Sequence, residues 1–192
     1  MKKIVKITGL LLLVCILFRG IIYRNLISYT SVGTRGNITI TDEKLLAKIG
    51  DYSSNETIDI EEIIRIARVV TTEELSFSKN QISRNPNNLV NTHKANCIGY
   101  AALFNSIANH LIRTHRLEKK YEVKHRIGRL SFLGYNLHQL FDDPFFRDHD
   151  FNEIITLSYT SFRSIDPSLS DYLGIDYITT SFLEVKPAFQ PD

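Results

Sequence analysis

The chain has 192 residues, of which 43% are hydrophobic and 23% charged, and these values are typical of a globular protein with one core. Its 23 lysines and arginines nearly balance 21 aspartates and glutamates, which leaves a formal net charge of +2. This balance argues against a nucleic-acid-binding protein and against a disordered tail, so we expect function to depend on a local site. Two cysteines are too few for a disulfide framework or a cysteine-only zinc site.

The amino terminus has the layout of an export signal. Lysines precede an apolar run from Ile7 to Phe18, and extension to Tyr23 gives about 17 residues, near the lower limit for crossing a bilayer. No small-residue cleavage site follows, so we expect residues 1–24 to be an uncleaved membrane anchor. The domain is then expected outside the cytoplasm, in the periplasm or the extracellular space. The alternatives are a removed signal peptide, a lipoprotein signal at Cys15, or a hydrophobic helix packed on the domain.

Residues 25–56 alternate serine, threonine, glycine and asparagine with short apolar pieces, which predicts a stalk of low order. The domain is expected to occupy residues 57–192. Apolar residues at helical spacing between positions 60 and 70 predict its first amphipathic helix, with acidic residues in the first turn. A turn-rich, asparagine-rich loop then leads to a second predicted helix from about Asn96 to Arg113.

Segments typical of strands follow the two helices. Residues 121–127 alternate between side chains suited to a core and charged side chains, which is the period of a half-buried strand. Further segments of this kind are residues 129–135, 151–157, 162–165 and 177–185. Helices followed by strands predict an α+β domain with an antiparallel sheet, preceded by the N-terminal hydrophobic helix.

Cys97 is the only cysteine in the predicted domain, and it lies in the first turn of the second predicted helix. Backbone N–H groups and the helix dipole favour a thiolate at that position, which is the environment of a nucleophile. A lone cysteine is more commonly a small buried hydrophobe. A catalytic assignment of Cys97 therefore requires a partner base.

The segment from His149 to Asp166 supplies a base with an acidic partner. A hairpin that turns at Leu157 and Ser158 would place His149 opposite Asp166 on one sheet face, within reach of an imidazole–carboxylate hydrogen bond. Asp166 would then fix the tautomer of His149 and stabilise its imidazolium. A register shift of one residue would separate the pair.

Three short motifs resemble those of the transglutaminase-like superfamily, in its bacterial exported type. Cys97-Ile-Gly-Tyr-Ala resembles the family's Cys-x-x-x-Ala helix start, His149-Asp-Phe-Asn-Glu-Ile its His-x-aromatic-x-Glu-aliphatic strand, and Asp166-Pro-Ser its Asp-Pro-Thr. The order of the motifs is also that of the family, and the likeness covers roughly residues 57–170. Two positions depart from the family pattern, since Asp150 replaces a small residue and Phe151 replaces tryptophan.

The resemblance implies a papain/transglutaminase-like fold and a thiol mechanism that needs no metal or cofactor. The implied catalytic residues are Cys97, which attacks a peptide or carboxamide carbonyl, His149, which moves the proton, and Asp166, which orients His149. The backbone N–H of Cys97 is a candidate oxyanion donor, with Asn91 or Asn96 as possible second donors. Water as acceptor gives a peptidase or amidase and an amine gives an acyltransferase. Both outcomes remain open, and the expected partner is a peptide or protein rather than nucleic acid.

Three alternatives accompany this interpretation. His138 could serve as the base, although no Asp-Pro sequence lies at hairpin distance from it. A non-catalytic binding module on the same fold could retain the triad residues as structure. A metal could be collected by a polar group whose spacing matches no standard ligand pattern, namely His138, Asp142, Asp143, Asp148 and His149.

Overall fold

The computed structural model describes the chain except residues 1, 55–56, 81–82, 142–147, 159–160 and 183–192. Its α-helices are α1 (Lys2–Leu17), α2 (Arg19–Leu26), α3 (Glu43–Tyr52), α4 (Ile60–Glu74), α5 (Pro86–Thr92), α6 (Cys97–Thr114) and α7 (Pro167–Leu173). Its strands are β1 (Ile27–Arg35), β2 (Ser76–Phe77), β3 (Lys94–Ala95), β4 (Tyr121–Phe132), β5 (Tyr135–Asn136), β6 (Asp148–Thr156), β7 (Ser161–Ile165) and β8 (Thr179–Phe182), and a 3₁₀ turn, η1, covers Leu137–Gln139. The predicted α+β class is confirmed.

Both helices predicted for the domain are present, and polar side chains fix where they begin. The Asp59 carboxylate accepts a hydrogen bond from the Glu62 backbone N–H at 2.9 Å and caps α4. Asn96 caps α6 by accepting from the Ile98 backbone N–H at 3.1 Å, so Cys97 becomes the first helical residue. Apolar faces of α4 and α6 contribute most of the buried core.

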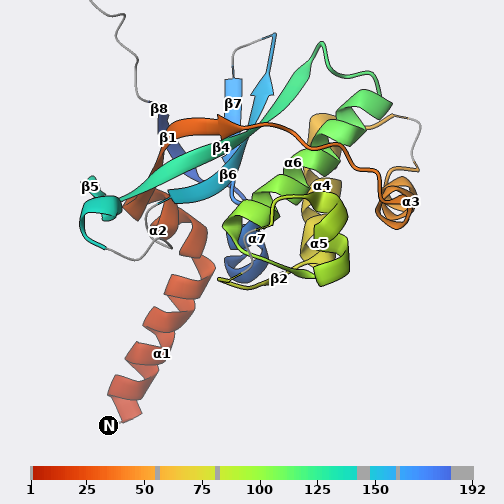
Figure 1. The fold of residues 1–192 in the computed structure, drawn as a ribbon. Helices are drawn as coiled ribbons and strands as arrows, with labels where there is room; N and C mark the ends of the chain where they lie inside the picture. Colours follow the sequence, from red (N-terminus) through yellow and green to blue (C-terminus); the bar gives the residue numbers. More distant parts are fainter. Residues whose placement is uncertain (1, 55–56, 81–82, 142–147, 159–160, 183–192) are drawn as a thin grey trace, which may run out of the picture.

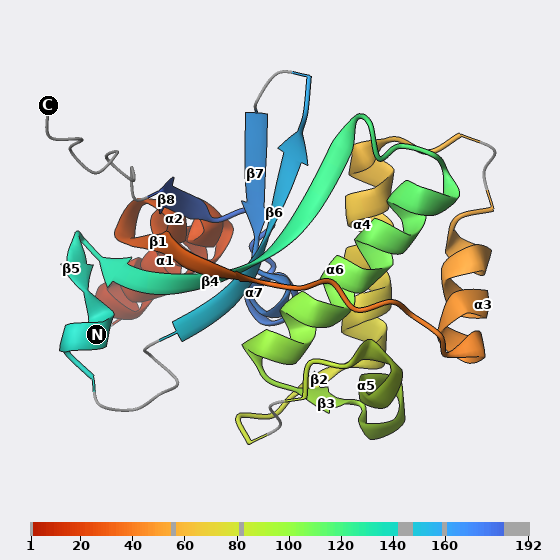
Figure 2. The same cartoon turned by 45° about the horizontal axis from the view of Figure 1, so that its top comes forward.

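The main sheet has the strand order β7-β6-β4-β1-β8, and β5 pairs with the end of β4. Its pairs are antiparallel except for β1 and β8, which run parallel. The expectation of a purely antiparallel sheet is therefore wrong at one edge. Figure 2 shows helices α3 to α6 gathered at one end of this sheet and α1 and α2 at the other. The amide of Asn152 on β6 donates to the Ala101 carbonyl of α6 at 3.0 Å and ties the two layers together.

The expectation that residues 25–56 form a stalk of low order is wrong. Strand β1 lies inside the sheet between β4 and β8, and its Tyr29 is fully buried. Helix α3 follows, capped by Asp42 and packed on the core through Leu45 and Ile49. The serines and threonines that suggested a stalk lie between β-branched and aromatic residues, and this mixture also suits a strand.

The expected single N-terminal hydrophobic helix is divided into α1 and α2. Within the described part of the chain, no one helix combines the length and apolarity needed to cross a membrane. Lys6–Leu17 and Arg19–Leu26 meet the criteria only together, with a bend of 72° between them. The apolar side chains of α1 from Ile7 to Leu17 are exposed, and Figure 1 shows α1 projecting from the rest of the molecule. Helix α2 instead contacts the domain, because the Arg19 side chain donates to the carbonyls of Leu173 and Gly174 at the end of α7.

Candidate active site

Cys97 lies where the loop after α5 enters α6, and only 6% of its surface is exposed. Its backbone N–H belongs to the first helical turn, where N–H groups have no acceptor inside the helix. The preceding chain packs tightly on this turn at Gly99, since a Cβ there would lie 2.6 Å from the Ala95 Cβ and 2.9 Å from the Ser83 carbonyl oxygen. The start of α6, which carries Cys97, is therefore closely packed against the preceding chain.

His149 and Asp166 are brought together as the sequence predicts. His149 Nε2 and Asp166 Oδ2 form a hydrogen bond between β6 and the residue that begins α7. The Asp166 carboxylate also caps α7, since its other oxygen accepts from the Ser168 backbone N–H and hydroxyl at 3.0 and 2.6 Å. Both residues are buried, so water does not compete strongly with these bonds.

The register of the hairpin differs from the predicted one. Asn152 pairs with Ile165 and Thr156 with Ser161, so Asp166 lies diagonal to His149 rather than directly opposite it. The pair survives because the displacement is two residues, which keeps both side chains on one face of the sheet.

The Cys97 side chain also lies close enough to the imidazole of His149 to favour the charged form of that ring. Because Nε2 is engaged with Asp166, Nδ1 is the ring nitrogen left for the sulfur. The structure therefore brings the three predicted site residues together, with His149 bonded to Asp166 and next to Cys97. The side chain of His138, the alternative base, lies outside the described part of the structure.

The electrostatics of the site favour a charged pair of His149 and Asp166. Burial opposes a charge on His149, but the Asp166 carboxylate and the contact with Cys97 outweigh it and raise the pKa of His149 well above its ordinary value. Burial likewise opposes a charge on Asp166, but the His149 ring and the donors of Ser168 and Leu169 lower the pKa of Asp166. An imidazolium held by a carboxylate is suited to stabilise a neighbouring thiolate.

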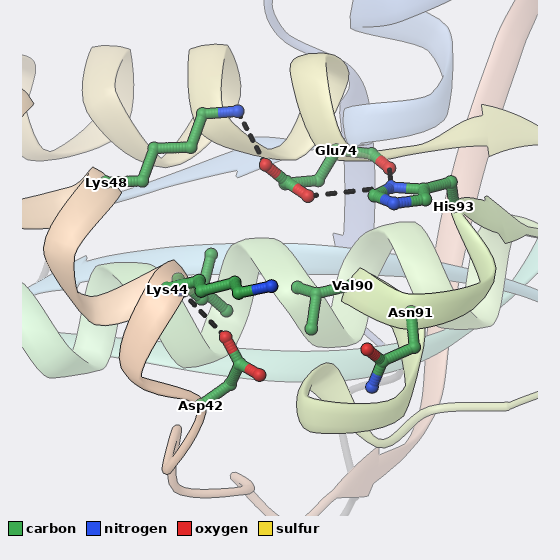
Figure 3. A pocket seen from close by; sticks show the side chains of 8 residues that line it. Asp42, Lys44, Lys48, Glu74, Val90, Asn91 and His93 are labelled. Atoms are coloured by element: carbon green, nitrogen blue, oxygen red, sulfur yellow. Dashed lines mark hydrogen bonds and ion pairs between the residues drawn. The ribbon is translucent and has the colours of Figure 1, made fainter.

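Of the two side chains expected as the second oxyanion donor, Asn91 is not supported. The Asn91 amide donates to the Asn87 carbonyl of its own helix at 3.0 Å. Figure 3 shows Asn91 in a separate hollow between α3 and α5, together with Lys44 and Glu74. The Asn96 side-chain oxygen accepts the bond that caps α6, which leaves the Asn96 amide nitrogen as a candidate second donor beside Cys97. The Cys97 backbone N–H remains the candidate oxyanion donor.

Sequence analysis missed two tyrosines that extend the site. The Tyr29 hydroxyl on β1 donates to Asp166 Oδ2 at 3.0 Å. The Tyr23 hydroxyl on α2 lies 2.7 Å from the Tyr29 hydroxyl. The Tyr29 ring also packs edge-on against His149, with centroids 5.6 Å apart. Both tyrosines fall in segments that we expected to be anchor or stalk, so only the strand-like composition around Tyr29 could have indicated its burial.

A second buried histidine–aspartate pair lies on the neighbouring strands. His125 Nε2 and Asp150 Oδ2 are 2.7 Å apart, and Arg35 Nε bonds the same carboxylate oxygen at 2.5 Å. Burial opposes ionisation of Asp150, but His125 and Arg35 lower its pKa. Asp150, which departs from the motif of the family that the sequence resembles, thus has its own hydrogen-bond partners in His125 and Arg35.

An apolar cavity of about 290 Å³ opens beside the imidazole of His149. Its lining comes from β2, β6 and α7, namely Phe77, His149, Ser168, Leu169, Tyr172 and Leu173. The cavity is well suited to receive an apolar side chain next to the candidate base.

Comparison of the chain with protein-family models, with curated protein sequences and with solved structures gives no significant match. The functional argument therefore depends on the geometry of the site.

Proposed function

We propose that the protein is a thiol-dependent peptidase, amidase or acyltransferase of the transglutaminase-like type. Cys97 is the nucleophile, His149 the acid–base and Asp166 the residue that orients His149. The observation that carries the proposal is the position of the His149 ring, which bonds the Asp166 carboxylate and also lies beside the Cys97 side chain. A structural cysteine packed as a hydrophobe does not require a charged imidazole beside it.

The reaction follows from these contacts. His149 takes the thiol proton, and the thiolate adds to the carbonyl carbon of a peptide or carboxamide, forming a C–S bond. The oxyanion that develops accepts a hydrogen bond from the Cys97 backbone N–H. His149 returns its proton to the nitrogen as the C–N bond breaks, which releases the amine and leaves a thioester on Cys97.

The second half of the reaction reverses these roles. Water or a second amine gives a proton to His149 and attacks the thioester carbon, and the C–S bond breaks. Water yields a carboxylic acid and an amine yields a new amide, while Cys97 regains its starting state in either case.

The apolar cavity beside His149 supports a peptide or protein substrate with an apolar side chain close to the scissile bond. Its aromatic lining, from Phe77 and Tyr172, gives a large contact area for an aliphatic or aromatic group. Burial of one such side chain contributes about 1.5–3 kcal/mol to binding.

The proposal includes attachment to a membrane through the N-terminal segment, with the domain outside the cytoplasm. It is supported by lysines at the start of the chain and by exposed apolar side chains along α1. Flotation of full-length protein with lipid vesicles tests it, and full-length chains that remain in the vesicle-free fraction would contradict it.

The catalytic proposal is tested by labelling the cysteines with iodoacetamide at pH values from 5 to about 8.5, the pKa of a free thiol. Peptide mapping then gives separate rates for Cys97 and for Cys15, the exposed cysteine of α1. We expect Cys97 to be alkylated rapidly well below pH ~8.5, and Cys97→Ser to remove that reaction while Cys15 still reacts. A Cys97 that reacts only near pH ~8.5 or not at all in the folded chain would overturn the proposal and favour a non-catalytic binding module.

A further inference from the structure

Asp166 Oδ2 is shared between two donors. It bonds His149 Nε2, and it also accepts the hydroxyl proton of Tyr29 at 3.0 Å. Tyr29 is fully buried, and the Tyr29 ring lies at 76° to the imidazole plane. The Tyr29 hydroxyl therefore bonds the same carboxylate oxygen of Asp166 that bonds His149.

The direction of the hydrogen bonds follows from the number of protons. A phenol has one O–H, and that of Tyr29 is given to Asp166, so Tyr23 must donate to the Tyr29 oxygen across their 2.7 Å contact. Burial and the nearby Asp166 charge raise the pKa of Tyr29 well above its ordinary value, so Tyr29 keeps its proton. The result is a one-way chain of donors that runs from α2 through β1 to Asp166.

We propose that Tyr29 is a positioning residue that weakens the charge interaction of Asp166 with His149. Tyr23, which donates to Tyr29, couples this interaction to helix α2. The inference rests on the proposed function, because it concerns the same base. A hydrogen bond donated to a carboxylate compensates part of its charge, so less of that charge acts on the imidazolium. Tyr29 thereby keeps His149 acidic enough to release its proton to the leaving amine.

Within the described part of the chain, the titratable groups that contact His149 come from a few elements. Cys97 contacts it from α6, Asp166 from the start of α7, and Tyr29 from β1, with Tyr23 behind Tyr29. Its chain neighbour Asp150 is bonded to Arg35 and His125.

A moderating role and a merely supporting role predict opposite signs. If Tyr29 moderates Asp166, Tyr29→Phe leaves the carboxylate more basic and raises the pH at which His149 loses its proton. If Tyr29 only supports the shape of the site, its loss loosens the pair and lowers that pH, as Asp166→Asn does.

The experiment is an NMR titration of the His149 ring in the full chain, with the signal assigned by its absence in His149→Gln. We expect Tyr29→Phe to move the midpoint upward by up to about one pH unit, the equivalent of one hydrogen bond. Tyr23→Phe should move it upward by less, because the bond from Tyr29 to Asp166 remains.

Tyr100→Phe is the matched control. Tyr100 is also buried and bonds a carboxylate, Asp171, at 2.7 Å, so its loss removes a similar bond outside the triad. The His149 midpoint should be the same in Tyr100→Phe as in the parent chain.

An unchanged or lowered midpoint in Tyr29→Phe would overturn the inference. Absence of rapid Cys97 alkylation below pH ~8.5 in the parent chain would instead contradict the proposed function. The two failures are therefore distinguishable. If Tyr29→Phe does not fold, the graded upward shift in Tyr23→Phe decides, and its absence overturns the inference.

Discussion

Two buried histidine–aspartate pairs lie close together on β4, β6 and the start of α7, and they differ in what else touches them. Asp166 has no cation among its bonded partners in the described structure other than His149, and that histidine reaches a cysteine. Asp150 bonds both His125 and Arg35. The charge of Asp166 is thus available to stabilise an imidazolium, whereas that of Asp150 is already compensated by a guanidinium.

This comparison shows why a histidine–aspartate contact alone does not identify a base. His125 is only 2% exposed and its pair ties β1, β4 and β6 together through Arg35. We expect the first pair to control the chemistry of Cys97 and the second to control stability. Variants at the two pairs test whether they differ in this way.

The largest effect is expected from truncating the two histidines. His149→Ala should abolish rapid alkylation of Cys97 below pH ~8.5, a loss of orders of magnitude, because no imidazolium remains beside the sulfur. His125→Ala should keep that reactivity in the folded protein and lower the melting temperature, because it leaves a cavity and an incompletely paired Asp150.

Rates of Cys97 alkylation and thermal melting of both variants measure these effects. Folded His125→Ala protein that has lost the low-pH reaction would break the comparison. His138→Ala serves as a further control, and a larger effect there than in His149→Ala would mean that the base is misassigned.

A second test removes the charge of Asp150. Asp150→Asn keeps the shape of the side chain but leaves the partly exposed Arg35 without its counter-ion, so we expect the free energy of unfolding to fall by about 1–3 kcal/mol. Urea denaturation measures this loss, and the double variant Asp150→Asn with Arg35→Gln should recover part of it. No loss of stability in Asp150→Asn would show that the second pair is not structural.

The pH dependence of stability gives a third test. The lowered pKa of Asp166 contributes stability that is present above its unfolded value, about 3.9, and is lost as pH falls through the lower folded value. The raised pKa of His149 contributes stability that is present below about 6.5 and is lost as pH rises through the higher folded value. The difference in melting temperature between the parent chain and His149→Gln should therefore be largest between pH ~4 and ~6.5 and shrink on both sides. A difference that is independent of pH would contradict a charged pair.

The smallest effect is expected from removing residues 2–17. The apolar side chains of α1 from Ile7 to Leu17 are exposed, and among the described residues Arg19 and Tyr23 of α2 bond the domain. We expect the shortened chain to retain its stability within about 0.5 kcal/mol and to retain the alkylation profile of Cys97. A shifted profile would show that α1 itself acts on the triad.

Local sequence signals predicted the elements that carry the triad. The apolar stripe predicted α6 from about Asn96, and the strand-like segment 162–165 predicted β7, which ends at Ile165 just before Asp166. The predicted register of the β6–β7 hairpin was wrong by two residues, because its turn residues specify no particular turn type. The prediction that His149 and Asp166 lie on one face of the sheet is nevertheless confirmed, since a register shift of two residues keeps a side chain on the same face.

The support around the triad is not local in sequence and escaped prediction. Tyr29 and Asp166 are 137 residues apart, and the parallel pairing of β1 with β8 joins the two ends of the domain. A polar strand such as β1 has little hydrophobic alternation, so its composition did not distinguish it from a stalk. The bend between α1 and α2 was also missed, although Arg19 and Gly20 stand at it, because apolar residues resume directly after them.

The most direct test of the central claim is the pH profile of Cys97 alkylation in Asp166→Asn, compared with Asp150→Asn. Asparagine preserves the shape of each site but removes the negative charge. We predict that Asp166→Asn moves the low-pH limb upward towards pH ~8.5, while folded Asp150→Asn keeps the parent profile. An unchanged profile in Asp166→Asn, or the upward shift in Asp150→Asn instead, would contradict the assignment of Asp166 to the triad.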